Sequence, residues 1–436
     1  MTLVAFWLAL LIVALPQELV QDSWLTLVSG REIVQHGLPT HDALFVWTHG
    51  RQWVDQQWLA QLFFYELAKV GGVRLVLAAH LALLAGAAGV AVVAARRRAS
   101  ARSVFLVAVV CLLAAPWGLQ LRAQTVAELL FVVVFALLAD EQPPTGRRFY
   151  ALLALLMLWA NVHGTVVLGA ALAMLRGATL LRTTWRRGVM LLTCAPLCTL
   201  ASPYGLALVG YYHRLLANPL LPKFLDEWRK STPSRATAPF YLVLVAAAWL
   251  VLRRGHRLSL YERLALAFLA LAAVDAVRSI VWFAFAAAIV LPATLDEVLG
   301  RSHVLTGART AAVAALVLPV ALVVAYATLA HGRPSPTWPA AAADAAARAA
   351  GPTGRVFAEE RFADWLLWER PDLRRRIAFD IRFELFDDSQ FRRLARLHAR
   401  NGVPGGYRVW LGRRAAPAGT RTVYRSSDAV VAVRDS

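Results

Sequence analysis

The chain has 436 residues, of which 59% are hydrophobic and 17% charged. Soluble globular domains carry about 25% charged residues, so a chain of this length with an ordinary polar surface is excluded. Its apolar residues occur in blocks long enough to cross a bilayer core of about 30 Å. The composition therefore predicts a multi-pass membrane protein.

The formal net charge of +19 comes almost entirely from arginine, since the sequence has only three lysines, at 69, 223 and 230. Much of it lies in short runs between apolar blocks, such as Arg96-Arg97-Arg98 and Arg253-Arg254. Arginine placed in this way is typical of cytoplasmic loops under the positive-inside rule. No long basic face or RNA-binding motif accompanies the charge, so we expect no nucleic-acid partner.

We predict about eleven membrane spans, all of them helical. In chain order they lie near 2–16, 75–95, 103–119, 125–139, 149–162, 164–181, 188–203, 240–252, 262–276, 279–295 and 310–330. The first segment lacks a basic n-region and a small-x-small cleavage site, which favours a retained helix over a signal peptide.

Arginine placement predicts the orientation of these spans. With a cytoplasmic N-terminus, the short loops at 96–102, 140–148, 182–187, 253–257 and 301–309 fall inside and hold most of the short-loop arginines. The long segments 17–74, 204–239 and 331–436 then fall outside. We therefore divide the chain into a membrane domain, 1–332, with a long first outer loop, and an outer domain, 333–436.

The tail after the Pro-rich hinge at 333–336 has the character of a soluble domain. An alanine-rich helix to residue 350 is followed by a strand at 355–358, a helix at 362–369, a strand at 375–381, a helix at 390–400 and short strands near 407–411 and 422–434. Strands that alternate with helices predict a small α/β domain.

Three carboxylates stand out in the first outer loop. Asp22 lies where the first span emerges, at a depth where partial desolvation raises proton affinity toward that of a general base; the alternative is a helix N-cap. Asp42 follows Pro39 and is either a turn residue or an acceptor or metal ligand. Asp55 precedes an amphipathic stretch, 58–68, and is an N-cap or a ligand of the same kind.

Arginine and histidine mark other outer boundaries. Arg122, followed by Gln124, is confined between two apolar spans, where a guanidinium needs a cavity, a partner such as phosphate, or access to headgroups. Asn161 and His163 end a fully apolar segment. Each is a site candidate or a structural residue.

The remaining candidates lie later in the chain. Arg278 is three residues after Asp275, so the two either neutralise each other or leave Arg278 for a ligand, and Glu227 lies in the outer loop after residues 203–205. The predicted topology brings Asp22, Arg122, His163, Glu227 and Arg278 to one membrane face. The sequence contains no phosphate-binding GxxxxGK[ST] loop, no GxSxG elbow and no HExxH.

These motifs resemble those of bacterial multi-pass proteins of the glycosyltransferase C superfamily. The first outer loop has the pattern Asp-x-Trp…Gly…Ile…Gly-x-Pro-x-x-Asp, at Asp22, Trp24, Gly30, Ile33, Gly37, Pro39 and Asp42. Further matches are Arg122-x-Gln124, residues 159–164, residues 203–205, Arg278, and in the tail Arg355–Phe357 with Phe379-Asp380-x-Arg382. The sequence departs from the expected pattern at Thr26 and Ala123, where histidine and proline are usual.

The resemblance implies a membrane glycosyltransferase of the bacterial inner membrane that uses a polyprenyl-phosphate sugar and acts on a glycan, lipid or protein acceptor outside the cytoplasm. Asp22 would be the base. The donor phosphate and sugar would be bound by Arg122, Gln124, Asn161, His163, Glu227 and Arg278. Asp42 or Asp55 would hold the acceptor or a divalent metal. A lipid flippase or transporter, and a ligase or polymerase that uses a lipid pyrophosphate, remain alternatives; the absence of a repeat and the charges at one face favour surface chemistry.

Overall fold

The computed structural model describes residues 19–115, 118, 120–142, 144–300, 338–400, 403–413 and 415–434. They divide into two compact units. The first lies within Gly71–Leu206 and Pro222–Gly332, and the second within Gln17–Val70, Ala207–Leu221 and Arg333–Ser436. The second unit therefore combines the first long polar segment with the tail. The predicted division at residue 332 stays a prediction, and the predicted spans 2–16 and 310–330 and the hinge at 333–336 lie outside the described residues.

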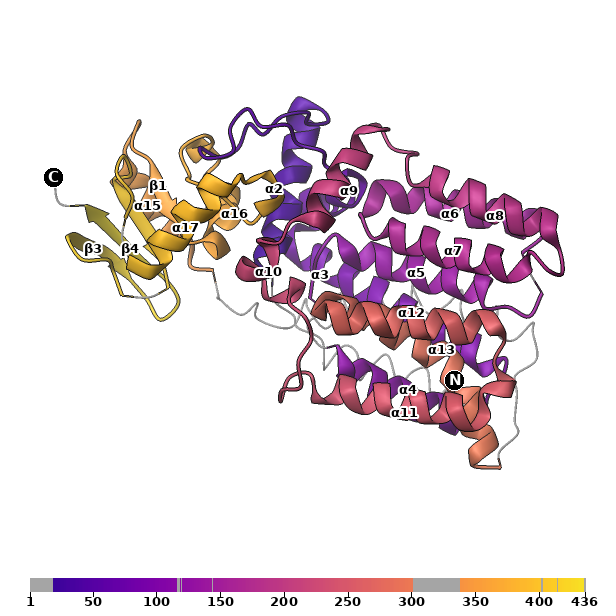
Figure 1. Cartoon of the computed structure of the whole chain (residues 1–436). Coiled ribbons are helices and arrows are strands. Elements are labelled where there is room, and N and C mark those ends of the chain that lie inside the picture. The colour runs from indigo at the N-terminus through magenta and orange to yellow at the C-terminus, as the bar shows by residue number, and fades with distance from the viewer. Residues whose placement is uncertain are drawn as a thin grey trace. The chain divides into compact units, whose positions relative to one another are not determined.

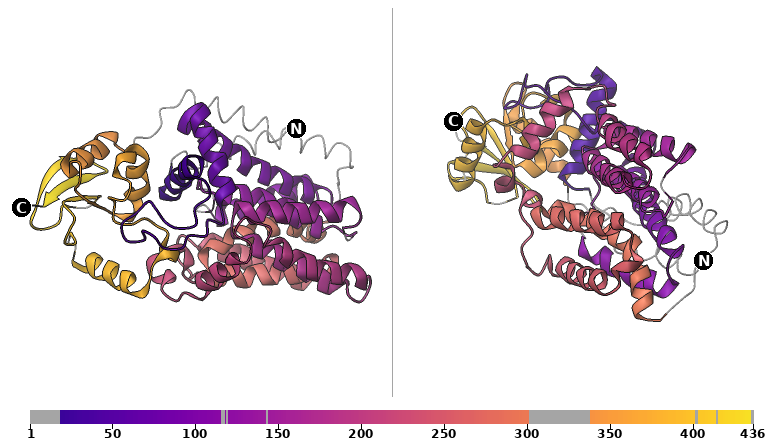
Figure 2. Two further views of the ribbon diagram at one scale, coloured as in Figure 1. Left: turned by 90° about the horizontal axis from the view of Figure 1, so that it is seen from above. Right: turned by 45° about the vertical axis from the view of Figure 1, so that its right-hand side comes forward.

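The first unit is a bundle of helices that mostly run along a common direction (Figures 1 and 2). It consists of the second half of α3 (Trp58–Arg96), α4 (Ala101–Ala114), α5 (Gln124–Leu138), α6 (Arg147–Val162), α7 (Val166–Leu180), α8 (Trp185–Cys198), α11 (Ala238–Arg254), α12 (Leu260–Asp275) and α13 (Ile280–Val298), with the short 3-10 helices η2 (Asp226–Trp228), η3 (Gly255–Arg257) and η4 (Val277–Ser279). Every apolar segment predicted between 75 and 295 coincides with one of these helices.

Three of the described helices are long and apolar enough to cross a membrane, namely Trp58–Arg96, Ala238–Arg257 and Val277–Val298. Shorter apolar helices occupy Ala101–Ala114, Gln124–Leu138 and Val166–Leu180. The structure thus confirms a membrane protein that is mostly helical, while the expected eleven spans and the side of the membrane that each end faces stay predictions.

Polar contacts join the predicted inner loops at one end of the first unit. Arg98 pairs with Glu262 at the start of α12, and the Ser100 hydroxyl donates to Asp296 at 2.5 Å. Within the loop at 140–148, Arg148 pairs with Asp140 at 2.6 Å. These residues belong to, or directly flank, the loops at 96–102, 140–148 and 253–257 and the end of α13. The contacts of Arg98 and Ser100 therefore place the loop at 96–102 beside the start of α12 and the end of α13.

Close helix packing in the second unit depends on two glycines of the first-loop motif. α2 (Gln21–His36) ends at Gly37, whose φ of 82° favours glycine. A β-carbon on Gly30 would lie 2.3 Å from the Gln61 carbonyl oxygen, so only glycine allows α2 to approach the first half of α3 this closely. α9 (Ala207–Ala217) belongs to the same unit, and α10 (Leu221–Phe224) begins at the last residue of that unit's middle segment, Ala207–Leu221.

The tail forms the predicted small α/β domain. A mixed four-stranded sheet has the order β1-β2-β4-β3, and α15 packs against β2, β3 and β4. The elements are α15 (Ala340–Ala350), β1 (Val356–Ala358), α16 (Glu360–Glu369), the short 3-10 helices η5 (Pro371–Leu373) and η6 (Phe383–Leu385), α17 (Asp388–Arg400), β2 (Val409–Gly412), β3 (Thr420–Arg425) and β4 (Val430–Arg434). The β1–β2 pair is parallel, and β4 runs antiparallel to both of its neighbours.

The strand predicted at 375–381 is wrong. Only Ile377 forms a bridge, with Val356. Arg375 has a φ of 62°, which breaks an extended strand. The backbone of this segment bonds instead to the first loop, where Arg375 N–H donates to the Leu44 carbonyl at 2.8 Å and Val46 N–H to the Ile377 carbonyl at 3.0 Å. Tertiary contacts thus replace the expected sheet ladder.

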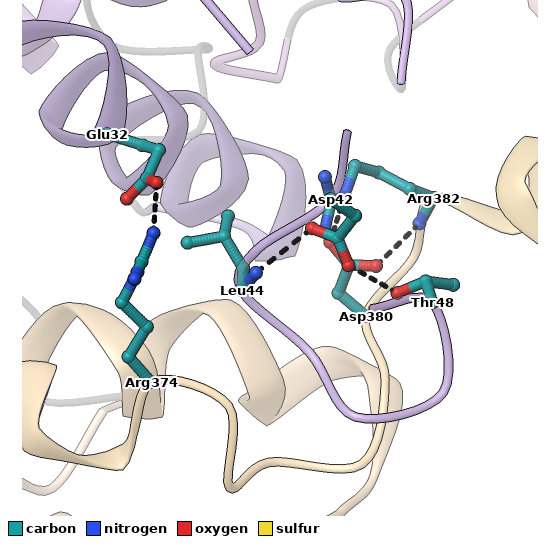
Figure 3. Close-up of polar contacts among 7 residues, drawn as sticks. All are labelled: Glu32, Asp42, Leu44, Thr48, Arg374, Asp380 and Arg382. Carbon is teal, nitrogen blue, oxygen red and sulfur yellow. Dashed lines mark hydrogen bonds and ion pairs between the residues drawn. The ribbon is translucent and has the colours of Figure 1, made fainter. Parts of the chain in front are cut away.

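A buried arginine joins the first loop to the tail (Figure 3). The Arg382 guanidinium donates to Asp42 at 2.8 Å and to Asp380 at 2.5 Å, and lies 4.2 Å from the centre of the Trp53 ring. The Arg382 side chain is 3% exposed and both carboxylates 0%. Burial by itself would lower the pKa of Arg382, but Asp380 and Asp42 outweigh it and raise the pKa. We call this trio the Arg382 clasp.

We expect Arg382→Met to lower the free energy of unfolding by about 3–5 kcal/mol, because it leaves two buried carboxylates without their cation. Arg370→Met is the matched control, since Arg370 pairs with Asp344 and Asp372 at a half-exposed site and should cost less than about 1 kcal/mol. Thermal unfolding of the full chain in detergent measures both. Equal effects would contradict a special role for the clasp.

Candidate functional site

Charged residues from three separate segments meet in the first unit, at the end away from the predicted inner loops. Glu227 accepts a hydrogen bond from Arg122 and lies 3.8 Å from the Arg278 guanidinium. Arg122 also donates to Gln120 Oε1 at 2.9 Å. The three charged side chains are 22–27% exposed, so solvent or a ligand can reach them. We call Arg122, Glu227 and Arg278 the boundary triad; it carries a net charge of +1.

Backbone contacts hold the Glu227 loop beside Arg278. Val277 N–H donates to the Arg229 carbonyl and Ser231 N–H to the Val274 carbonyl, each at 3.0 Å. The Arg278 guanidinium lies 4.4 Å from the centre of the Trp228 ring, a cation–π contact that fixes its orientation. Arg278 thus pairs with Glu227, and the alternative that it neutralises Asp275 has no ion pair to support it among the described residues.

His163 lies within electrostatic reach of all three triad residues. Its Nδ1 accepts from Thr165 N–H at 3.2 Å, so the neutral ring carries its proton on Nε2. Burial, together with Arg278 and Arg122, lowers the pKa of His163 to about 3. The imidazole is therefore neutral at physiological pH, and its chemistry is that of an N–H donor rather than of an acid–base catalyst.

Gln124 and Asn161 have partners of their own. Gln124, in the first turn of α5, donates to Glu128 Oε1 at 3.2 Å. Asn161 donates to the Met157 carbonyl at 2.9 Å and to the Ala201 carbonyl at 2.6 Å, which ties the end of α6 to the turn after α8. The Gln124 contact lies within α5, and the Asn161 contacts hold the end of α6 beside the turn after α8.

A small apolar cavity of about 50 Å³ lies between α3, α4 and α13. Its lining includes Ala88, Val92, Cys111, Ala115, Val281 and Ala288. Val281 lies in the first turn of α13, three residues after Arg278 in the sequence, and the rest of the lining comes from apolar helices. The cavity has the lining that a hydrocarbon chain requires.

The second unit holds Asp22, Asp42 and Asp55. Asp22 lies in the first turn of α2, whose N-cap is Val20, so the N-cap alternative for Asp22 is wrong. Asp42 uses one oxygen for Leu44 N–H and Arg382 and the other for the Thr48 hydroxyl. Burial acts to raise its pKa, but Arg382 and Thr48 outweigh it and hold the pKa below the usual value. Asp42 thus has the contacts of a structural residue.

Asp55 and Asp364 are buried carboxyls with unmet hydrogen-bonding capacity among the described residues. Asp55 Oδ1 accepts weakly from Gln57 N–H at 3.4 Å, while Oδ2 has no partner there. Burial raises the pKa of Asp55 to about 7. On α16, neither carboxylate oxygen of Asp364 has a hydrogen-bond partner among the described residues. Burial is the main cause that raises the pKa of Asp364 well above its usual value, and the nearby charge of Asp380 adds to it. Asp22 also interacts electrostatically with Asp364.

No group of three or more histidine, cysteine or acidic side chains in the described part of the chain is placed to hold a metal ion. Sequence reasoning missed Trp228 and Asp364. Neither belongs to a charge pattern or to a motif with fixed spacing, so only spatial proximity reveals them. Thr165 was also missed, although its place two residues after His163 is a usable signal.

Comparisons with solved structures identify the fold. ArnT from Cupriavidus metallidurans aligns over 99% of this chain and 97% of its own, with a TM-score of 0.53 and 17% identity in the apo state, and 0.52 and 16% with undecaprenyl phosphate bound. The archaeal oligosaccharyltransferase AglB from Archaeoglobus fulgidus, solved with an inhibitory peptide and a dolichol-phosphate, covers 94% of this chain and 69% of its own, with a TM-score of 0.51 and 10% identity. No protein-family model and no curated sequence matches the chain.

The chain has the glycosyltransferase C fold. The resemblance read from the motifs of the first loop is thereby confirmed at the level of architecture. Within this glycosyltransferase C fold, the boundary triad and His163 lie where apolar helices end. The roles of the individual site residues stay predictions.

We expect the His163 ring to stay neutral between pH 8 and pH 5, because burial and the two arginines oppose its protonation. Nitrogen-15 NMR of histidine-labelled full-length protein, with His163→Gln for assignment, should show one set of shifts with the proton on Nε2. An ordinary histidine titrates near pH 6.5. A titration midpoint near pH 6.5 for His163 would contradict the lowered pKa of the buried ring.

For Asp55, a raised pKa means that the folded state keeps a proton which the unfolded state loses above about pH 4. Its stabilising contribution is complete below pH 4 and declines by about 4 kcal/mol as the pH rises through 7. Asp55→Asn, which keeps the shape of the neutral acid, should therefore raise the melting temperature over wild type more at pH 8 than at pH 5. The exposed Asp387→Asn is the control, and an equal gain at both pH values would disprove the shift.

Proposed function

We propose that the protein transfers a sugar from a polyprenyl-phosphate donor to an acceptor at the extracytoplasmic membrane surface. The observation that carries this proposal is the boundary triad, in which Glu227 holds Arg122 and Arg278 together at the ends of apolar helices. Arginine forks suit phosphate geometry. The apolar lining of the cavity beside Val281 has the chemistry of a contact with a lipid tail, and the glycosyltransferase C fold supports a lipid-linked substrate.

In the proposed reaction an acceptor hydroxyl attacks the anomeric carbon of the donor sugar, and the bond from that carbon to the phosphate oxygen breaks. The lipid phosphate leaves with one more negative charge than it had in the donor. Arg122 and Arg278 offset this charge as it develops. The neutral His163 donates its Nε2 proton in a hydrogen bond to the phosphate or sugar, and Gln124 and Asn161 support the same binding site.

Asp22 is the proposed base that takes the proton of the acceptor hydroxyl. It lies at the half-buried start of α2, and the buried Asp364 interacts with it, which disfavours two ionised carboxylates at once. Asp55 is the remaining candidate to hold the acceptor or a divalent metal. The same proposal places the protein in the bacterial inner membrane with its N-terminus in the cytoplasm. The acceptor in this proposal is a glycan, a lipid or a protein.

Purified protein in lipid, offered radiolabelled polyprenyl-phosphate sugars, tests the proposal. Arg122→Gln and Arg278→Gln should each reduce transfer by about 10²–10³-fold, the usual loss when one group that stabilises transition-state charge is removed. Asp22→Asn removes the proposed base and should reduce transfer by about 10²–10⁴-fold. Arg147→Gln, at the exposed start of α6, is the matched control and should transfer normally.

Two results would count against the proposal. Normal turnover by Arg122→Gln and Arg278→Gln would remove the triad from the reaction. If no donor is consumed but labelled lipid crosses vesicle membranes only when the protein is present, the protein is a flippase.

A further inference from the structure

A second polar site lies in the first unit, far from the boundary triad. A pocket of about 430 Å³ is formed by the end of α7, the turn after it, the start of α8 and the start of α12. α7 has 15 residues and begins three residues after His163, so its other end lies about 20 Å farther along the helix axis. The pocket lining includes Glu141, Arg176, Thr183, Thr184, Arg187 and Tyr261.

Arg176 brings a buried positive charge into this lining, and none of the ion pairs among the described residues includes it. The residue is 7% exposed, donates to the Asp140 carbonyl at 2.9 Å and lies 5.3 Å from the centre of the Tyr261 ring. No carboxylate of the described residues forms an ion pair with it. The acidic side chains nearby are engaged elsewhere, since Asp140 pairs with Arg148 and Glu262 with Arg98. A buried guanidinium is costly unless it has such a partner.

Three buried polar atoms of the lining residues have no hydrogen-bond partner within the described parts of the chain. They are Arg176 Nε, the Thr184 hydroxyl and the Tyr261 hydroxyl. Most buried polar groups in proteins are bonded, so these three atoms leave hydrogen-bonding capacity on residues that line the pocket. Arg187 adds a second, exposed guanidinium, while Glu141 is the one carboxylate of the lining.

We propose that this pocket binds the phosphate group of an anionic membrane lipid. The guanidiniums of Arg176 and Arg187 supply donors that suit phosphate oxygens. The neighbouring surface favours a lipid source, because Leu181, Trp185 and Leu260 are 41%, 61% and 54% exposed. Exposed tryptophan and leucine beside arginine are typical of the headgroup level of a bilayer. The site is separate from the proposed transfer reaction and needs no donor sugar.

Native mass spectrometry of the full chain with added dioleoylphosphatidylglycerol tests the site, with phosphatidylcholine as the zwitterionic comparison. Arg187→Gln should weaken phosphatidylglycerol binding at least tenfold, and because Arg187 is exposed the variant should fold. Arg176→Gln should weaken it further. Arg182→Gln, an exposed arginine outside the lining, is the matched control and should bind as wild type does. Sugar transfer is not the readout, so failure here leaves the proposed function untouched.

The arms of the experiment separate the sources of phosphate. If glycerol phosphate does not compete with phosphatidylglycerol for binding, and Arg176→Gln and Arg187→Gln lose phosphatidylglycerol binding, the ligand is a lipid headgroup. If inorganic phosphate and glycerol phosphate compete fully, and the same variants lose them, the phosphate site stands but its ligand is soluble and the lipid assignment is overturned. If Arg176→Gln and Arg187→Gln bind phosphatidylglycerol as tightly as Arg182→Gln does, the site is disproved.

Discussion

The ion pairs of Glu227 with Arg122 and Arg278 are the interaction on which the candidate site depends. Two guanidiniums at the ends of apolar helices repel each other and lose hydration. One carboxylate between them offsets much of that cost and still leaves a net positive charge. This arrangement keeps both arginines close together and accessible, with capacity left for one anion.

The Arg382 clasp depends on the same electrostatics with the charges reversed, and its role is structural. There, one guanidinium lies between two carboxylates, and all three side chains are almost fully buried. A ligand has no access to it, so the clasp stabilises the contact between the first loop and the tail. Exposure, rather than residue type, therefore distinguishes the proposed binding triad from the structural one.

A third arginine site completes the comparison. Arg176 is as buried as a structural residue, but no carboxylate of the described chain pairs with it, and the lining of its pocket contains further unsatisfied donors. We propose that an external anion supplies the missing ion pair. The first unit thus has two positively charged sites, one at each end of its helices, and we assign a phosphate-bearing ligand to both.

The sequence by itself determined the membrane class, the position of each described apolar helix, the α/β character of the tail and the residue types of the site, because these follow from hydropathy and local periodicity. It also singled out Arg122, His163, Glu227 and Arg278 as residues near one end of the helices. Only the tertiary structure decided that Glu227 rather than Asp275 pairs with Arg278 and that Asp42 forms an ion pair with Arg382. It also decided that residues 375–381 bond to the first loop instead of forming a strand. Those outcomes depend on contacts between segments up to about 340 positions apart, and local patterns carry no information about such distant partners.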